Sequence, residues 1–388
     1  MWTVLHIIDI VLWVFMACSV LYVAFFAFVS LFSRPSSPRP SYATRHFSFL
    51  ILYPAYKEDR VIVHSVKQFL EQTYPQEYYH VAVISDHMED TTNQQLRALP
   101  VTLHILTDEK SSKARALQYA MRHTEKVYDY VVILDADNVV EPDFLSLLDA
   151  SCQKGNHAIQ CHRCAKNSNN SVAVLDGISE EINNTIFRRA HNTIGLSSAL
   201  IGSGMCFDFQ WFREHVERLA SAVEDRELES SLIQEKIFIK FEEHIPVLDE
   251  KVSHAENFER QRLRWLNGQL QTLLLMLPNI PHAIATGNIN YIDKTIQQAL
   301  IPRSILLAMI PVLALVMLCL APVWSIKWWA LFLILCLSLL IAIPSRLRTG
   351  MLWVRLLCFP VLAFKMIKNL FHLDKNNKDF LHTTHGNE

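Results

Sequence analysis

Three apolar runs without a charged side chain stand out along the chain, over residues 10–32, 304–326 and 328–345. A helix needs about 20 apolar residues to cross the hydrocarbon core of a bilayer. The first two runs reach that length, and the third is slightly shorter. The first also lacks the basic start and small-residue cleavage site of a signal peptide. We therefore expect a retained N-terminal transmembrane anchor over 1–33 and two transmembrane helices over 301–345, connected through 322–327.

Between the first two apolar runs, short apolar stretches alternate with stretches of helical periodicity. The pattern predicts strands over 47–53, 79–85, 101–106 and 130–134, and helices over 61–72, 90–99 and 113–124. Such alternation is typical of an α/β fold whose mainly parallel sheet is covered by helices on both faces. Ligands bind at the carboxyl ends of such strands. Tyr53-Pro54, Asp86 and Asp135 stand at those ends, so we expect them to converge on one crevice.

The remaining segments differ in composition. Residues 34–46 are rich in proline and serine and read as a linker, which places the main domain at 47–270. Residues 271–300 are apolar only in part and too short to cross, which predicts an interfacial segment. Residues 346–372 are apolar but contain basic side chains, so they form either an interfacial helix or a further transmembrane span. Residues 373–388 are a polar tail.

The distribution of basic residues predicts how the chain is oriented in the membrane. Basic residues follow the first and third apolar runs, and positive residues favour the cytoplasmic side. We therefore expect an integral membrane protein, in the cell inner membrane, whose main domain is cytoplasmic. The chain has 388 residues, is 51% hydrophobic and has a net charge of −2. That near-neutral charge leaves no electrostatic footprint for nucleic acid, so we expect none as a partner.

Candidate chemistry begins with Asp135-Ala136-Asp137, which follows the apolar run at 130–134. Two carboxylates spaced in this way can face one Mg²⁺ or Mn²⁺ ion, since both ions prefer oxygen ligands. The same triplet also occurs in plain surface turns. Further along, Glu224 and Asp225 offer a general base. They also fit the acidic first turn of an ordinary solvated helix.

The order of the motifs is more specific than any one of them. They run Tyr53-Pro54-Ala55-Tyr56-Lys57-Glu58, Asp86, Lys113, Asp135-Ala136-Asp137, Gly202-Ser203-Gly204, Glu224-Asp225 and Gln261-x-x-Arg264-Trp265. This set resembles membrane-bound family 2 glycosyltransferases, on the branch of cellulose, chitin, hyaluronan and poly-N-acetylglucosamine synthases. It is also similar to ceramide glucosyltransferases. The resemblance implies a GT-A-type, Rossmann-like domain inserted between transmembrane helices.

The resemblance also implies roles for these residues, beginning with a UDP-sugar as donor. The donor would be bound by Tyr56, Glu58, Asp86, Lys113, Asp135, Gln261 and Arg264. A divalent cation would be held by Asp137 with help from Asp135. Asp225 would be the general base, with Glu224 as the adjacent alternative. The acceptor would meet Gly202, Ser203, Gly204 and Trp265.

The expected activity is inverting, metal-dependent transfer of a sugar to a growing β-linked polysaccharide at the cytoplasmic face. The tail at 380–385 is similar to the gating loop of processive synthases, with Thr383 and His385 as the gating residues. The alternative is transfer to a membrane lipid, which the small number of apolar runs favours. Few spans also suggest an accessory subunit or a homo-oligomer. A catalytically inactive scaffold is the third hypothesis, although this chain keeps all the acidic positions.

Overall fold

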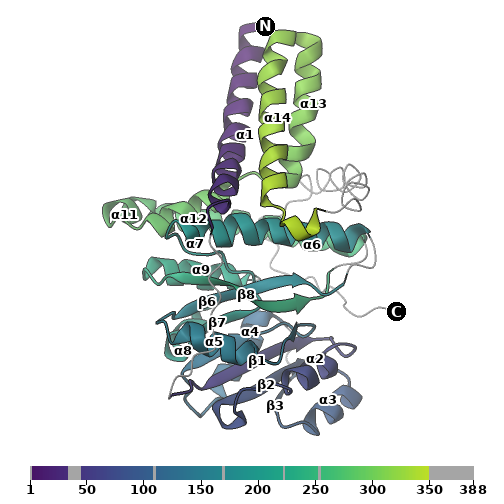
Figure 1. Ribbon diagram of the computed structural model, residues 1–388, viewed down its shortest axis with the longest axis vertical. Coiled ribbons are helices and arrows are strands. Elements are labelled where there is room, and N and C mark those ends of the chain that lie inside the picture. The colour runs from purple at the N-terminus through teal and green to yellow at the C-terminus, as the bar shows by residue number, and fades with distance from the viewer. Residues whose placement is uncertain are drawn as a thin grey trace.

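The computed structural model describes residues 2–33, 45–107, 111–167, 171–221, 223–251 and 255–348, with the backbone alone for residues 2, 171–172 and 255–264. Three long helices form a bundle at one end, and an α/β domain lies at the other (Figure 1). Residues 34–44 of the linker expected at 34–46 lie outside the described residues, as do residues 349–372 of the expected interfacial helix or further span and the tail at 373–388.

An eight-stranded mixed sheet forms the centre of the α/β domain, in the order β3-β2-β1-β4-β7-β6-β8-β5. Its first four strands in this order are parallel. Strands β7 and β5 run antiparallel to their neighbours, whereas β6 and β8 are parallel to each other. The strands are β1 (Phe49–Tyr56), β2 (Tyr79–Asp86), β3 (Thr102–Leu106), β4 (Tyr130–Ile133), β5 (Val139–Val140), β6 (Ala158–Ala165), β7 (Met205–Asp208) and β8 (Ile239–Asp249). The sheet is mostly parallel, as the sequence predicts.

Strand β1 runs past Pro54, where the sequence pattern predicts its end. Strand β4 pairs with β1 only from Phe49 to Leu52, while β2 accompanies β1 as far as Tyr56. Beyond Leu52 the strand therefore has a neighbour on one side only. A proline is tolerated at such an edge because its missing N–H leaves no ladder bond broken. The extension carries Tyr56 to the end of the strand, level with Asp86.

Alternating side chains of the strands feed two apolar cores, one on each face. Leu50 and Leu52 point to one face, and Phe49, Ile51 and Tyr53 point to the other. The first face is covered by α4 (Lys113–Arg122), α8 (Phe209–His215) and α9 (Glu224–Gln234), and the second by α2 (Ile62–Phe69), α3 (Asp90–Arg97) and α5 (Phe144–Cys152). Short 3₁₀ turns at Gln76–Tyr78 and Val216–Arg218 complete this part.

The bundle consists of α1 (Trp2–Ser30), α13 (Arg303–Leu320) and α14 (Pro322–Ala342). Among the described residues, these three helices are long and apolar enough to cross a membrane. Their facing side chains form a third core, in which Val20, Leu335 and Trp328 are fully buried. A 3₁₀ turn, Ser345–Leu347, follows the bundle.

The predicted connection over 322–327 is wrong, because the break between the last two helices lies at Ala321. Pro322 starts α14, a position where its missing N–H costs nothing. Lys327 consequently lies inside α14. Its ammonium pairs with the carboxylate of Asp9 on α1 and lies 4.7 Å from the Trp324 ring centroid. These contacts compensate a charge that the apolar surroundings would otherwise disfavour.

A layer of helices separates the bundle from the sheet (Figure 1). It contains α6 (Ser171–Asn183), which continues through a π-helical stretch, Asn184–Ala190, into α7 (His191–Thr193). It also contains the C-terminal half of α10 (Ala255–Met276), a 3₁₀ turn at Leu277–Asn279, α11 (Ile280–Ala285) and α12 (Ile289–Ala299). The segment from α7 to β7 runs from this layer to the sheet and contains Gly202, Ser203 and Gly204.

Candidate active site

Strands β1 and β2 end side by side, and each is followed by a residue with left-handed backbone. Tyr56 stands opposite Asp86 in the ladder, and the next residues, Lys57 and His87, both have φ of +54°. The Lys57 N–H donates to the Asp86 carbonyl at 3.1 Å. Non-glycine residues rarely adopt this conformation, and when they do it is often at a functional site. Both backbone segments therefore turn sharply after their strands, where the sequence predicts the nucleotide site.

Asp86 is buried and already partnered. Its Oδ1 accepts from His87 Nδ1 at 2.6 Å and from Ser111 Oγ at 3.0 Å. The His87 ring is partly exposed and meets the Tyr56 ring edge-on, with 5.7 Å between centroids. The structure thus brings the predicted Tyr56 and Asp86 together. It adds His87, whose ring the Asp86 carboxylate orients.

The second feature is a cluster of three carboxylates, from Asp135, Asp137 and Asp249. One oxygen from each lies within 4.8 Å of the others. Asp135 and Asp137 follow β4, and Asp249 ends β8, which lies three places further across the sheet order. An all-oxygen donor set of this kind fits Mg²⁺ or Mn²⁺. Asp249 is a candidate ligand that the sequence analysis missed.

Backbone and amide groups fix these carboxylates in place. The Glu250 N–H donates to Asp137 Oδ2 at 2.8 Å. Asn138 Nδ2 donates to Asp137 Oδ1 at 3.3 Å and to Asp249 Oδ1 at 3.4 Å. Asn138 Oδ1 in turn accepts from the Asp135 N–H at 3.0 Å and from the Ser203 hydroxyl. Asn138 therefore connects the carboxylates of Asp137 and Asp249 with the Asp135 backbone and with the predicted Gly202-Ser203-Gly204 turn.

Two buried cations compensate the charge of Asp249. Lys251 Nζ lies 2.7 Å from Asp249 Oδ2, and Arg163 Nε lies 3.9 Å from the same oxygen. Burial alone would lower the pKa of Lys251, but the acids Asp249, Glu180 and Asp176 together raise it above its ordinary value. These cations lower the electrostatic cost of gathering three carboxylates in a buried place.

Lys113 joins the carboxylate cluster to the candidate base. Its ammonium pairs with Asp135 Oδ1, donates to the Gly202 carbonyl at 2.6 Å and lies 3.6 Å from Glu224 Oε1. Burial would lower the pKa of Lys113, but Asp135, Glu224 and Asp225 together raise it above its ordinary value. Lys113 is therefore cationic and central, as expected for a residue that would face a diphosphate.

Glu224 and Asp225 form the acidic first turn of α9, but Glu224 is buried rather than solvated, and both carboxylates lie beside the Gly202 turn. Gly202 has φ of +80°, and a Cβ there would lie 3.6 Å from Asp225 Oδ2 and 3.8 Å from Glu224 Oε1. Burial raises the pKa of Glu224 to about 7, with Lys113 opposing and Asp225 adding to the rise. A carboxyl group with a pKa near neutrality is suited to proton transfer.

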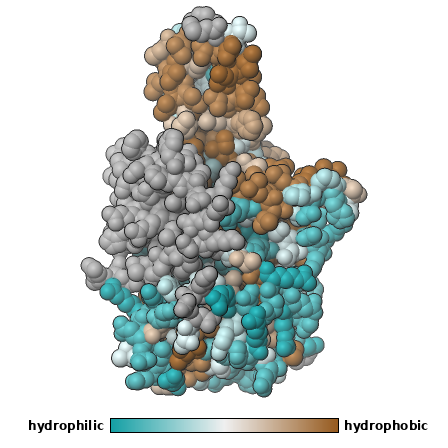
Figure 2. Space-filling view, turned by 180° about the vertical axis from the view of Figure 1, so that it is seen from behind, coloured by the Kyte–Doolittle hydropathy of each residue, from teal (hydrophilic) through white to brown (hydrophobic). Residues whose placement is uncertain are grey.

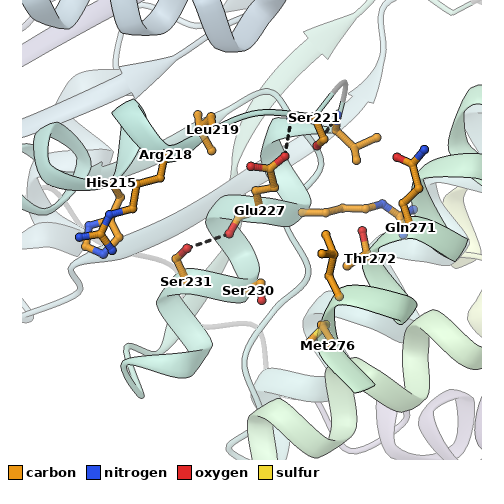
Figure 3. Close-up of a pocket in the computed structure, with 13 residues that line it drawn as sticks. His215, Arg218, Leu219, Ser221, Glu227, Ser230, Ser231, Gln271, Thr272 and Met276 are labelled. Carbon is orange, nitrogen blue, oxygen red and sulfur yellow. Dashed lines mark hydrogen bonds between the residues drawn. The ribbon is translucent and has the colours of Figure 1, made fainter. Parts of the chain in front are cut away.

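A pocket of about 190 Å³ lies beside the same helix, between α9 and α10. Glu227, Ser230 and Ser231 of α9 line it with Gln271, Thr272 and Met276 of α10 (Figure 3). The Glu227 carboxylate accepts from the Ala220 and Ser221 N–H groups at 3.0 and 2.6 Å. Glu227 thus holds the loop before α9, which leaves Glu224 and Asp225 as the candidate bases.

The remaining predicted residues are less well placed. Glu58 directly follows Lys57, at the turn after β1, and is partly exposed. Trp265 is half-buried on α10. The side chains of Gln261 and Arg264, on the same helix, lie outside the described residues, as do Thr383 and His385. The roles of all these residues stay predictions.

The sequence held a weak signal for the missed ligand. The stretch before Asp249 alternates apolar and polar residues and then ends in an acid, like the strands that end at Asp86 and Asp135. Asn138 stands next to the recognised triplet. His87 gave no signal, because its importance arises from backbone conformation and from its contact with Tyr56.

Comparison with known proteins identifies the class. Residues 46–268 match the family described as "Glycosyltransferase like family 2". Since these residues make up more than half of the 388-residue chain, the protein belongs to this family. It is a glycosyltransferase that uses a nucleotide-sugar donor. No curated protein matches the chain in sequence.

Solved structures share the fold. The mannosyltransferase PcManGT from Pyrobaculum calidifontis, in complex with GDP-Man and Mn²⁺, has a TM-score of 0.53 at 18% identity, over 93% of this chain and 100% of that one. S. aureus TarS 1-349 gives 0.43 at 12% identity, over 83% and 88% of the two chains. Glucosyl-3-phosphoglycerate synthase from Mycobacterium tuberculosis gives 0.42 at 16% identity, over 59% and 78%. The likeness to PcManGT shows a GT-A-like fold.

Proposed function

We propose that the protein is an inverting, metal-dependent glycosyltransferase that takes its sugar from a UDP-sugar and adds it to an acceptor at the membrane surface. One observation carries this proposal: Lys113 bridges the three-carboxylate cluster and the acidic pair at the start of α9, with Gly202 between them. The carboxylate cluster, which would hold the diphosphate through a cation, therefore lies close to the acidic pair, which would take the proton.

Asp225 is our candidate general base. It would take the proton of an acceptor hydroxyl, whose oxygen then bonds to the anomeric carbon as the nucleoside diphosphate leaves with the bonding electrons. A single displacement of this kind inverts the anomeric configuration, so an α-linked donor gives a β-linked product. The missing Cβ of Gly202, 3.6 Å from Asp225 Oδ2, leaves room for the acceptor. Glu224 would keep Lys113 in position.

A divalent cation, when bound by Asp135, Asp137 and Asp249, would neutralise charge on the leaving diphosphate. Lys113 would contribute a second positive charge beside it. Tyr56, His87 and Asp86 would bind the nucleotide at the ends of β1 and β2. There Tyr56 offers a ring for packing, and the Asp86–His87 pair offers hydrogen-bonding groups.

The described part of the bundle favours a lipid acceptor over the growing polysaccharide that the sequence analysis placed first. Its three helices bury Val20, Ala314 and Leu335 completely against one another. Among the residues described, the facing surfaces are therefore filled, which is unsuited to a polymer channel. Transfer to a polysaccharide remains the second candidate. The tail at 380–385 supports it, and a partner chain would then supply the channel.

We also propose that the α10–α12 layer lies at the membrane surface and that the domain at 47–270 faces the cytoplasm. Leu275, Ile284 and Ile289 expose 66%, 63% and 66% of their surface. Figure 2 shows apolar side chains on the bundle and again at the level of this layer, with polar surface below. An apolar area beside membrane-spanning helices is expected to contact lipid.

The test uses the purified full-length protein in lipid nanodiscs with UDP-glucose, UDP-N-acetylglucosamine or UDP-galactose, Mg²⁺ or Mn²⁺, and extracted membrane lipids. We expect a single sugar to appear on a lipid. We expect Asp225→Asn and Asp137→Asn to abolish transfer, and Asp143→Asn, at an exposed acid away from the site, to leave it intact. A high-molecular-weight product would establish the polysaccharide instead. Transfer that persists in Asp225→Asn would refute the base assignment.

A further inference from the structure

A buried ion pair lies behind the acidic first turn of α9. Lys294 of α12 is fully buried, Glu229 of α9 is 5% exposed, and Lys294 Nζ lies 3.9 Å from Glu229 Oε1. Burial lowers the pKa of Lys294 and raises that of Glu229, while each partner's charge opposes the shift in the other. In such a buried position, apolar side chains of similar volume often stabilise a protein as well as an ion pair does, or better. The presence of an ion pair here therefore points to a purpose other than stability.

Glu229 also holds the loop that carries Gly202. Its Oε2 accepts from the Leu200 N–H at 2.6 Å. Leu200 stands two residues before Gly202, whose carbonyl receives the hydrogen bond from Lys113. Glu229 is also one helical turn after Asp225, so both side chains lie on the same face of α9. A single buried carboxylate thus fixes the separation between the candidate base and the loop opposite it.

We propose that Glu229 is a positioning residue for sugar transfer, held in its ionised form and in its rotamer by Lys294. Glu229 does not touch substrate. It sets the distance between Asp225 and the Gly202 turn, and so the space in which the acceptor hydroxyl approaches the donor. This proposal rests on the proposed function, because it assumes that Asp225 and Gly202 enclose the reacting groups.

The test compares two double variants in nanodiscs. Glu229→Gln/Lys294→Met removes both charges but keeps an acceptor for the Leu200 N–H, and Glu229→Leu/Lys294→Met removes that acceptor as well. We expect the Leu variant to fold with a melting temperature near that of the wild type, to retain its KM for the donor, and to lose about 10- to 100-fold in kcat, as expected for an ångström-scale misplacement. The Gln variant should keep more of its kcat.

Asp149→Leu is the matched control. Asp149 is 4% exposed and accepts from the Phe47 N–H at 3.0 Å, so it is also a buried carboxylate on a backbone amide. Asp149 lies in α5, and the amide that it binds precedes the start of β1, at the other end of that strand from Tyr56. This variant should lose stability and retain kcat. If the Leu double variant also retains kcat, or loses kcat only in step with its melting temperature, the pair is merely structural and the proposal is wrong.

Amide hydrogen exchange keeps the two proposals distinguishable. In the Leu double variant, exchange should rise at residues 199–204 and in the first turn of α9, whereas in Asp149→Leu it should rise around residue 47. If the wild type shows no transfer with any donor, the proposed function fails. The exchange pattern still decides whether Glu229 positions the loop. Unchanged exchange at 199–204 would overturn that role irrespective of activity.

Discussion

The buried position of Glu224 beside Lys113 and Asp225 makes the fold less stable at neutral pH than at acidic pH. Its pKa is raised by burial from an ordinary value of 4.5 to about 7. Because the folded state binds this proton more tightly than the unfolded chain does, Glu224 contributes stability that is fully present below pH 4.5 and lost as the pH rises to about 7. A buried carboxyl group with this behaviour is typical of a functional position.

Glu224→Gln is therefore expected to gain stability relative to the wild type as the pH rises. The difference in unfolding free energy should grow by up to about 3 kcal/mol between acidic and slightly alkaline pH. Chemical denaturation in detergent, at about pH 5 and pH 8, measures it. Transfer by the wild type should fall below about pH 7, as protonation of Glu224 removes one partner of Lys113. A pH-independent difference in stability would contradict the raised pKa.

At the residue scale, a substitution of Asp249 tests whether this residue belongs to the proposed metal site. Asp249→Asn keeps the size of the side chain but removes the charge that would bind a cation and that now pairs with Lys251. Since the loss of an outer partner alone costs about 10- to 100-fold in metal affinity, the loss of a direct ligand should weaken Mn²⁺ binding by at least about tenfold. Titration of Mn²⁺ by electron paramagnetic resonance, without donor, measures this directly. Equal affinity in Asp249→Asn and Asp143→Asn would remove Asp249 from the site.

Asp249 also shows what the sequence could and could not predict about the site. Asp86, Asp135 and Asp137 were found because each follows an apolar run that forms a parallel strand. Strand β8, by contrast, reaches the cluster from across the sheet, through β7 and β6. Its place beside β6 depends on packing between segments far apart in sequence, which no local pattern encodes. His87 was missed for the related reason that backbone strain is set by the tertiary structure.

At the scale of whole elements, the long apolar runs and alternating strands were the easiest to predict, because their periodicity reflects burial along one direction. Their ends were less predictable. Strand β1 continues through Pro54 because β4 stops pairing at Leu52. Helix α14 starts at Pro322 and therefore includes Lys327, whose charge pairs with Asp9 on α1. In both cases the end of an element depends on a neighbour that is distant in sequence.

The packing of α10 against the start of α9 allows a test of whether α10 fixes the position of α9. Gly268 of α10 faces Val223, and a Cβ at Gly268 would lie only 2.5 Å from Val223 Cγ1. Alanine normally stabilises a helix interior relative to glycine by about 1 kcal/mol. Here Gly268→Ala should instead destabilise by roughly 1–3 kcal/mol, as overpacking does. It should also lower kcat, because Val223 immediately precedes Glu224 and Asp225.

Gly268→Ala/Val223→Ala provides the internal control, since it removes the γ-carbons that the new methyl group would meet. Melting temperatures and kcat of the single and double variants decide the outcome. Recovery of both quantities in the double variant would locate the damage at this contact. If Gly268→Ala alone behaves as the wild type does, α10 does not press on the start of α9.

On the scale of the whole molecule, a polar chain connects a membrane helix to the layer behind the site. The Tyr22 hydroxyl, on α1, donates to Asp293 Oδ1 at 2.7 Å and contacts His191 Nε2 at 2.9 Å. Gln297 Nε2 donates to Asp293 Oδ2 at 2.8 Å, and Gln297 Oε1 accepts from Lys294 at 3.2 Å. Lys294 is the partner of Glu229. Hydrogen bonds and one ion pair thus connect α1 to α9, the helix that carries the candidate base.

Tyr22→Phe removes one hydroxyl and leaves Asp293 without that donor. A buried carboxylate that loses a hydrogen bond is destabilised by about 1–3 kcal/mol, so we expect a lower melting temperature. If α1 helps to hold Lys294, kcat in nanodiscs should fall as well, with the KM for the donor unchanged, since the nucleotide site lies at the far ends of β1 and β2. Ser30→Ala is the comparison, because the Ser30 hydroxyl bonds only within α1, to the Ala27 carbonyl. If Tyr22→Phe loses stability but keeps its full kcat, the polar chain attaches α1 to the domain without setting the position of Asp225. Loss of kcat in Tyr22→Phe, absent from Ser30→Ala, would make the membrane helix part of the apparatus that positions Asp225.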